Sequence, residues 1–211
     1  MKLAILGATG WIGGNILQEA KRRGHEVVAL VRDPAKLQQD GVEVRSLDLN
    51  RLPLAPQVFA GVDAVIASVG GRAQQDHAVV AQTAARLLEA LPDAGVRRLL
   101  WVGGAGSLEV APGVTLVSSP DFPEAYRAEA LAQGEALEVF RKSDSGVDWT
   151  FVSPAAEIYP GEREGDYRIG GDSFFTDASG KSRISVTDYA RAMLDEAEAA
   201  QYPGQRISVA Y

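Results

Sequence analysis

Cysteine is absent from this chain of 211 residues, and histidine occurs only twice. Without cysteine the protein forms no disulfide, no cysteine nucleophile and no thiolate metal site. His25 and His77 alone do not supply a histidine-rich metal centre. We therefore expect a protein that binds no metal.

Long apolar runs are missing as well. None approaches the roughly 20 residues that a helix needs to cross a bilayer. Only the short apolar run from Leu3 to Leu6 separates Lys2 from Gly7, which is too little for the apolar part of a secretory signal. These absences predict a cytoplasmic protein without membrane contact.

Positive charge is scarce relative to negative charge. The chain has 21 Lys and Arg against 28 Asp and Glu, a net charge of −7. A broad nucleic-acid-binding face would need the opposite balance. We therefore expect a small molecule as partner and no nucleic acid, and we leave a homodimer open.

Glycine, in contrast, is abundant, with 22 residues in the chain, against a usual share of about 7%. Short apolar runs that predict strands alternate with longer stretches that predict helices. This alternation is typical of a doubly wound, Rossmann-type α/β fold, in which helices cover both faces of a parallel sheet. The late acids Glu196 and Glu198 fit a solvated helix. The predicted strands are 3–6, 26–31, 42–47, 63–69, 98–102, 147–152 and 206–209, and the helices are 11–23, 76–91 with Asp76 as N-cap, and 123–142.

Two stretches, 104–122 and 155–182, interrupt this alternation. Each follows a predicted strand and is longer than an ordinary connection. Ligands bind at the carboxyl ends of strands in open α/β sheets. We therefore expect one domain over 1–211, in which the loop-rich segment 155–186 covers a substrate. The short strands expected near this segment are 167–169, 174–176 and 183–186, with a turn at 177–180.

The first glycine cluster is Gly7-Ala-Thr-Gly-Trp-Ile-Gly13, directly after the first predicted strand. Glycines at intervals of three residues allow a tight turn and a close approach of the backbone to a ligand. The helix that follows presents backbone N–H groups to an anion. We therefore predict that the phosphates of a dinucleotide bind this turn, through Gly7, Thr9, Gly10, Trp11, Ile12 and Gly13.

The end of the second predicted strand indicates which dinucleotide binds. Arg32 offers a guanidinium fork to a ribose 2′-phosphate, whereas the neighbouring Asp33 could hold a ribose 2′-hydroxyl. We therefore expect NADP(H) as the preferred cofactor and keep NAD(H) open. Residues that directly follow the later predicted strands lie at the same edge of the sheet. We therefore predict further cofactor contacts from Asp48, Leu49, Val69, Gly70 and Gly103.

The cofactor motif occurs together with three others: Val102-Gly-Gly-Ala-Gly-Ser-Leu108, Asp148-Trp-Thr-Phe-Val-Ser-Pro-Ala155 and Ser182-Arg-Ile-Ser-Val-Thr-Asp-Tyr-Ala190. In these motifs, and over nearly its whole length, the chain resembles the atypical short-chain dehydrogenases/reductases. It is most similar to their NAD(P)H-flavin reductase group, which is related to biliverdin reductase B and to NmrA-like proteins. The resemblance implies that Pro154 and Ala155 line the nicotinamide.

Short-chain dehydrogenases typically use Ser, Tyr and Lys, with the Lys four residues after the Tyr, so the resemblance makes Ser107 and Tyr126 the candidate catalytic residues. In this chain Ala130 stands four residues after Tyr126, and Gly104 stands where many relatives carry serine. A tyrosine without a neighbouring cation is a poor base for oxidising an alcohol.

Flavins and quinones make smaller demands on a protein, because they are already electrophilic and solvent can protonate the reduced product. We therefore expect an oxidoreductase that transfers hydride from NADPH to a flat, electron-poor acceptor such as free flavin or a quinone. The alternative is a non-catalytic, NmrA-like redox sensor that binds NADP(H).

Overall fold

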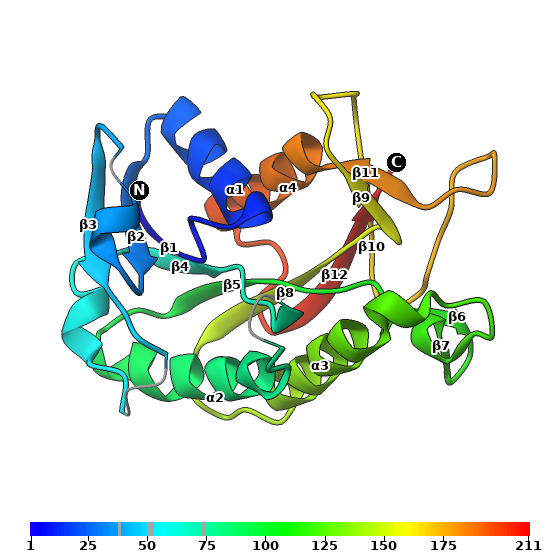
Figure 1. The fold of residues 1–211 in the computed structure, drawn as a ribbon, viewed down its shortest axis with the longest axis horizontal. Helices are drawn as coiled ribbons and strands as arrows, with labels where there is room; N and C mark the ends of the chain where they lie inside the picture. The colour runs from blue at the N-terminus through cyan, green and yellow to red at the C-terminus, as the bar shows by residue number, and fades with distance from the viewer. Residues whose placement is uncertain (38, 50–52, 73–74) are drawn as a thin grey trace.

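The computed structural model describes residues 1–37, 39–49, 53–72 and 75–211 (Figure 1). In this part of the chain one main sheet has the strand order β10-β12-β8-β5-β4-β1-β2-β3. Neighbouring strands are parallel, except that β10 runs antiparallel to β12. The strands are β1 (Lys2–Leu6), β2 (Glu26–Val31), β3 (Val42–Ser46), β4 (Ala64–Ala67), β5 (Arg98–Val102), β8 (Asp148–Pro154), β10 (Arg168–Gly170) and β12 (Gln205–Ala210).

The strand order reverses once. The chain builds outward from β1 through β2 to β3, and then restarts on the other side of β1 with β4. This is the doubly wound order, and the carboxyl ends of β1 and β4 mark the switch point where such sheets bind ligands. The predicted Rossmann-type fold is confirmed.

Helices cover both faces of the sheet, as Figure 1 shows. One face carries α1 (Trp11–Arg22) and α4 (Val186–Ala199), and the other carries α2 (Ala78–Asp93) and α3 (Glu124–Arg141). Every residue of β4 and β5 is buried, because strands sandwiched between two helical layers need apolar side chains on both faces. Two apolar cores result, one on each side of the sheet.

Two small sheets lie beyond the main one. The hairpin of β6 (Glu109–Ala111) and β7 (Val114–Thr115) occupies the predicted loop 104–122, and β9 (Glu157–Tyr159) pairs in parallel with β11 (Arg183–Ser185). Segment 155–186 thus contains β9, β10 and β11, and β10 extends the main sheet at its edge.

The predicted strand 174–176 is wrong. The backbone N–H of Phe174 donates to the Glu109 carbonyl at 2.8 Å, outside any ladder of its own segment. The Phe175 ring lies under the Arg168 guanidinium, 4.7 Å from its central carbon, and packs against the core beside α1 and α4. The backbone bond of Phe174 to the β6 hairpin and the packing of the Phe175 ring therefore replace strand pairing within the segment.

The predicted N-cap at Asp76 is wrong by one residue. The Asp76 N–H donates to the Gly71 carbonyl at 3.1 Å, which keeps Asp76 in the preceding loop. The N-cap of α2 is His77, whose side chain makes no capping hydrogen bond.

The prediction of a solvated face at the end of the chain is wrong for Glu196. This side chain is only 4% exposed and forms an ion pair with Arg98 of β5, with a nitrogen–oxygen distance of 2.5 Å. Burial lowers the pKa of the Arg98 guanidinium below its usual value, while Glu196 opposes that shift. The pair ties α4 to the sheet. Glu198 lies nearer the surface, paired with His25 and Arg23.

Candidate functional site

The turn between β1 and α1 closes only around glycine. Gly7 has a φ of +83°, and a Cβ there would lie 2.1 Å from the Ser68 carbonyl oxygen at the end of β4. A Cβ on Gly13 would lie 2.1 Å from the Gly7 carbonyl oxygen. Both distances are far inside van der Waals contact, so the phosphate turn and the end of β4 fit together only without these side chains.

The N-terminus of α1 is open above this turn. Gly10 is its N-cap and has no side chain to satisfy the first backbone N–H groups. Thr9, Gly10 and Trp11 are exposed around it, whereas Ile12 packs against the core beside α1 and α4. Backbone donors and the positive end of the helix dipole favour an anion here. The geometry fits the phosphates of a dinucleotide, with Ile12 contributing its backbone.

Arg32 and Asp33, which follow β2, differ in their side-chain interactions. The Asp33 carboxylate accepts a hydrogen bond from the Ala35 N–H at 3.1 Å and caps the short helix Pro34–Lys36. Arg32 is exposed, and no carboxylate in the described part of the chain pairs with it. Arg32 is therefore the better placed of the two to meet a ligand.

The other predicted contacts flank this turn along the carboxyl edge. Asp48 and Leu49 follow β3, and both are partly buried. The Leu49 side chain packs against the core beside α2 and α3, and its carbonyl accepts a hydrogen bond from Arg86. Val69 and Gly70 follow β4, beside the phosphate turn. These four residues thus lie on both sides of the switch point.

One face of α3 holds the loop after β4 in place. Buried Gln133 donates to the Val69 carbonyl and accepts from the Trp101 indole N–H, both at 2.9 Å. One turn earlier, the Glu129 carboxylate accepts from the Gly71 N–H at 3.0 Å. The sequence prediction missed Gln133 and Glu129, although their spacing of four residues on a helix with an apolar core face was the available signal.

His77 and Arg72 complete this loop. His77 Nδ1 lies 3.0 Å from the Glu129 carboxylate, and the Arg72 guanidinium stacks on the Tyr126 ring at 4.5 Å from its centre. The first turn of α3 therefore carries Tyr126 beside the loop that follows β4. Tyr126 is 50% exposed, so it does not serve to pack α3 on the sheet.

The glycines after β5 serve close packing. A Cβ on Gly103 would lie 2.1 Å from the Phe151 ring, and a Cβ on Gly106 would lie 2.6 Å from the Ala130 Cβ. Ala130 is the position at which typical short-chain dehydrogenases would carry lysine. The backbone at Gly106 therefore packs closely on Ala130, which is itself partly exposed.

The side-chain hydrogen bonds of Ser107 do not involve Tyr126. Its hydroxyl accepts from Arg206 at 3.4 Å, and Ser153 accepts from the same guanidinium at 3.4 Å. The Arg206 side chain is 2% exposed and pairs with Asp172; burial lowers its pKa, and Asp172 opposes the shift. No hydrogen bond joins Ser107 to Tyr126 in the part of the chain that the structure describes. Among the described residues, the two candidate catalytic residues therefore form no hydrogen-bonded pair.

Pro154 and Ala155 lie at the carboxyl end of β8, as expected. Pro154 is the last residue of β8, opposite Val209 of β12. Both Pro154 and Ala155 are buried, and the next residues, Ala156 and Glu157, are exposed. The chain therefore leaves the core and enters the covering segment 155–186 at this point.

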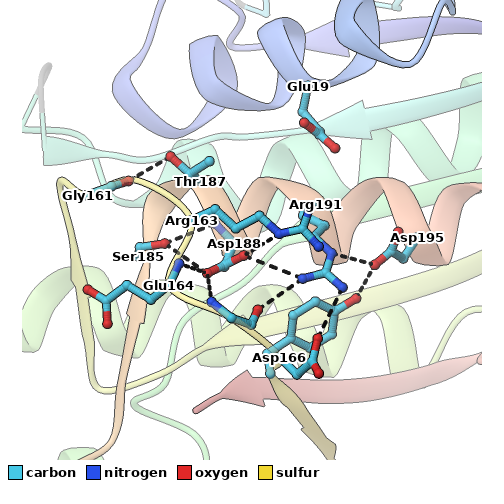
Figure 2. A network of polar contacts seen from close by, with 12 residues as sticks. Glu19, Gly161, Arg163, Glu164, Asp166, Ser185, Thr187, Asp188, Arg191 and Asp195 are labelled. Carbon is cyan, nitrogen blue, oxygen red and sulfur yellow. Dashed lines mark hydrogen bonds and ion pairs between the residues drawn. The ribbon is translucent and has the colours of Figure 1, made fainter.

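A buried carboxylate clamps the covering segment to the rest of the protein (Figure 2). Asp188, in the first turn of α4, is fully buried and accepts from the Glu164 N–H at 2.8 Å and the Gly165 N–H at 3.3 Å. The Thr187 hydroxyl donates to the Gly161 carbonyl at 2.7 Å. We call residues 161–165 the clamped loop.

The clamp extends to two further elements. Arg191 donates to the Gly165 carbonyl at 3.0 Å, and Figure 2 shows it between Asp188 and Asp195. The hydroxyl of the last residue, Tyr211, donates to Asp188 at 2.7 Å. Burial raises the pKa of the Tyr211 hydroxyl. The clamped loop, α4 and the C-terminus are thus joined through one carboxylate.

A turn that only glycine closes, placed at the switch point of a doubly wound sheet, defines a dinucleotide-binding protein of the Rossmann class. Comparison with known families agrees: the NAD(P)H-binding family matches residues 7–198, and the chain belongs to this family. The predicted place among the atypical short-chain dehydrogenases/reductases is confirmed.

Similar proteins match along the whole chain. It is 42% identical to the uncharacterized protein YwnB of Bacillus subtilis, over 99% of this chain and 98% of that protein. A solved structure from Burkholderia pseudomallei, provisionally described as an exported protein, is 42% identical with a TM-score of 0.91 and full coverage of both chains. Another from Streptococcus pneumoniae, provisionally described as an NADH-flavin reductase, is 36% identical with a TM-score of 0.90, over 100% of this chain and 99% of the other. The whole fold is therefore common to these proteins.

Among the described residues, no helix is long and apolar enough to cross a membrane. The same residues contain no group of three or more His, Asp or Glu side chains that could hold a metal ion.

Proposed function

We propose that the protein is an NADPH-preferring reductase of a flat, electron-poor acceptor, either free flavin or a quinone. The observation that carries this proposal is the combination of a glycine-built dinucleotide turn with Ala130 beneath the Gly106 backbone. The first feature binds the cofactor, and at the second the chain carries alanine in place of the lysine that typical short-chain dehydrogenases use for alcohol oxidation. The provisional description of the Streptococcus pneumoniae relative supports the same reading.

The preference for NADPH rests on the residues after β2. Asp33 caps its own turn, while Arg32 is exposed and lacks a carboxylate partner among the described residues. A guanidinium binds phosphate through two parallel hydrogen bonds. We infer that Arg32 binds the 2′-phosphate that distinguishes NADPH from NADH.

The chain has three tasks in this reaction. A bound nicotinamide supplies the hydride. The backbone around Gly7, Gly10 and Gly13 fixes the phosphates, and the buried ends of β5 and β8 at Gly103 and Pro154 exclude water from the ring. We infer that Tyr126 and Ser107 bind the acceptor by hydrogen bonds, with Ser107 held by Arg206.

The test is oxidation of NADPH and NADH with FMN, FAD, riboflavin and several quinones, beside a panel of secondary alcohols with NADP⁺. We expect turnover with at least one flavin or quinone, a lower KM for NADPH than for NADH, and no alcohol oxidation. Rates equal to those without enzyme for every flavin and quinone would contradict the proposal.

The different partners of Ser107 and Tyr126 favour a second candidate function, a redox sensor that binds NADP(H) without turnover. A sensor needs different affinities for its two ligand states. It would bind NADP⁺ and NADPH with clearly different Kd values and reduce none of the acceptors. Turnover with a flavin or quinone would decide in favour of the reductase.

We keep three further predictions with this proposal: a small-molecule acceptor as partner, a cytoplasmic location, and a homodimer as an open alternative to a monomer. Sedimentation of the purified protein at several concentrations distinguishes the two oligomeric states. Fractionation of cells that produce the protein tests its location.

A further inference from the structure

A cation and an aromatic ring lie together at the carboxyl edge of the sheet. The central carbon of the Arg72 guanidinium is 4.5 Å from the centre of the Tyr126 ring. Arg72 belongs to the loop after β4, and Tyr126 to the first turn of α3. Both side chains are exposed. A ligand at this edge can therefore reach the pair.

The charge of Arg72 is not neutralised by an acid. In the described part of the chain, no carboxylate pairs with Arg72, and its guanidinium stacks on the Tyr126 ring. The acid that anchors the same loop is Glu129, which is occupied by the Gly71 N–H and by His77, each at 3.0 Å. An unpaired guanidinium is thus held on a ring instead of on a carboxylate.

The position of Arg72 is fixed relative to the phosphate turn. The loop that carries it begins at Ser68, whose carbonyl oxygen is the atom that a Cβ on Gly7 would meet at 2.1 Å. Its middle is bound by α3, through Gln133 to the Val69 carbonyl and through Glu129 to the Gly71 N–H. These contacts hold Arg72 at the edge where the dinucleotide turn lies.

Arg72 places a cation beside Tyr126, although the lysine expected at position 130 is missing. Position 130, four residues after Tyr126, is an alanine on which the Gly106 backbone packs closely. The cation next to Tyr126 comes instead from the loop after β4. It lies over the face of the ring, and among the described residues no hydrogen bond joins it to the Tyr126 hydroxyl.

We propose that Arg72 is the cation of the acceptor site. The inference rests on the proposed function: NADPH, one proton and the oxidised acceptor give NADP⁺ and the two-electron-reduced acceptor. The hydride leaves one negative charge on the acceptor ring until a solvent proton neutralises it. A guanidinium at the ring edge stabilises that charge, and stacking on Tyr126 fixes the plane of the guanidinium.

The first test compares Arg72→Gln with Arg97→Gln. Arg97 is an arginine just before β5, at the opposite end of the sheet, whose guanidinium donates to the Gly146 carbonyl. With riboflavin and a neutral quinone, we expect Arg72→Gln to lower kcat by about 10- to 100-fold with little change in KM. Arg97→Gln keeps the wild-type rate. Arg72→Lys, which keeps the charge, restores most of kcat.

The second test measures binding without turnover. Calorimetry under anaerobic conditions, without nicotinamide, gives the Kd values for oxidised and for reduced riboflavin. We expect Arg72→Gln to weaken binding of the reduced, anionic flavin about tenfold and that of the oxidised flavin less than about twofold. Equal effects on both forms would mean that Arg72 only supports the loop.

The outcomes separate this inference from the proposed function. A wild-type protein that reduces no acceptor contradicts the proposed function, and the inference with it. An active wild type with Arg72→Gln and Arg97→Gln at equal rates overturns the role of Arg72 alone. A loss with FMN but not with riboflavin also overturns it, because Arg72 would then bind only the phosphate of FMN.

Discussion

The phosphate turn and the clamped loop build the candidate site by opposite means. The turn at Gly7 and Gly13 depends on missing side chains, since a Cβ at either position would lie 2.1 Å from a carbonyl oxygen. The clamped loop depends on side chains that are present, above all the fully buried Asp188. An added methyl group should therefore disrupt the phosphate turn, and the loss of one carboxylate should disrupt the clamped loop.

The two regions therefore control different properties of the protein. The phosphate turn presents backbone N–H groups directly to a ligand, so its failure reduces cofactor affinity. The clamped loop joins α4 and Tyr211 through Asp188, so its failure reduces the stability of the C-terminal half. Substitutions in the two regions should thus separate into binding defects and folding defects.

The largest effect is expected for Asp188→Ala. The loss of the carboxylate leaves the Glu164 and Gly165 N–H groups and the Tyr211 hydroxyl without their acceptor, next to Arg191. Such a loss lowers the free energy of unfolding by about 3–5 kcal/mol. Urea unfolding measures it. The matched control is Asp166→Ala, an acid that is 98% exposed near the same Arg191, and a similar loss in the control would contradict the clamp.

Gly13→Ala is expected to act on binding. Its Cβ would collide with the Gly7 carbonyl oxygen, and the shifted turn should weaken NADPH by about 100-fold, or about 3 kcal/mol. The control is Gly14→Ala, one residue later, where a Cβ would lie at an ordinary 3.5 Å from the Ala8 carbonyl oxygen. NADPH fluorescence titration should find both variants folded and only Gly13→Ala impaired. Equal affinities in the two variants would refute the turn as the phosphate site.

Arg32→Ala sharpens the comparison within the binding region. Because the guanidinium is assigned to the 2′-phosphate, its loss should raise the Kd for NADPH about 10- to 100-fold, which is about 1.5–3 kcal/mol for hydrogen bonds to charged groups. The Kd for NADH should change less than about twofold. The two titrations are run on the same preparation. Equal losses for both cofactors would remove the 2′-phosphate from the assignment.

Alkaline pH should weaken the clamped region with the smallest effect. Burial raises the pKa of Tyr167, Tyr189 and Tyr211, and it raises that of Tyr159 to about 12. Unfolded tyrosines lose their protons near pH 10 while these keep theirs, so unfolding releases protons and stability falls as pH rises from about 10 towards 12.

Urea unfolding between pH 8 and pH 11 measures this slope. Tyr159→Phe should make it shallower by less than about 1 kcal/mol in total, because solvent screens this partly exposed hydroxyl. A slope that is unchanged in Tyr159→Phe would remove Tyr159 from the explanation.

The sequence could predict the fold because each layer leaves a local pattern. Buried parallel strands are continuous apolar runs, and the turn at Gly7 and Gly13 is recognisable from the regular spacing of its glycines. Predictions from local sequence were wrong where a residue distant in the sequence determines burial or pairing. Glu196 has the sequence context of a surface acid, and only the fold brings Arg98 to it. The predicted strand 174–176 was overridden in the same way, by packing of Phe175.

The site was predictable to the same extent. The glycine turn and Arg32 follow directly from strands that the sequence reveals. The loop after β4 does not, because Arg72, Glu129 and Gln133 become neighbours only when α3 packs beside β4 and β5. Ser107 and Tyr126 likewise contact arginines from distant segments, Arg206 and Arg72. Side-chain chemistry across segments is the part that sequence spacing does not encode.

A crystal structure with NADP(H) bound tests the central claim most directly. The account predicts the pyrophosphate on the backbone N–H groups around Gly10, the 2′-phosphate against Arg32, and the nicotinamide beside Gly103 and Pro154. It also predicts an open space over the ring that Arg72 and Tyr126 border. A dinucleotide bound elsewhere, or a nicotinamide ring without open space towards these two side chains, would contradict it.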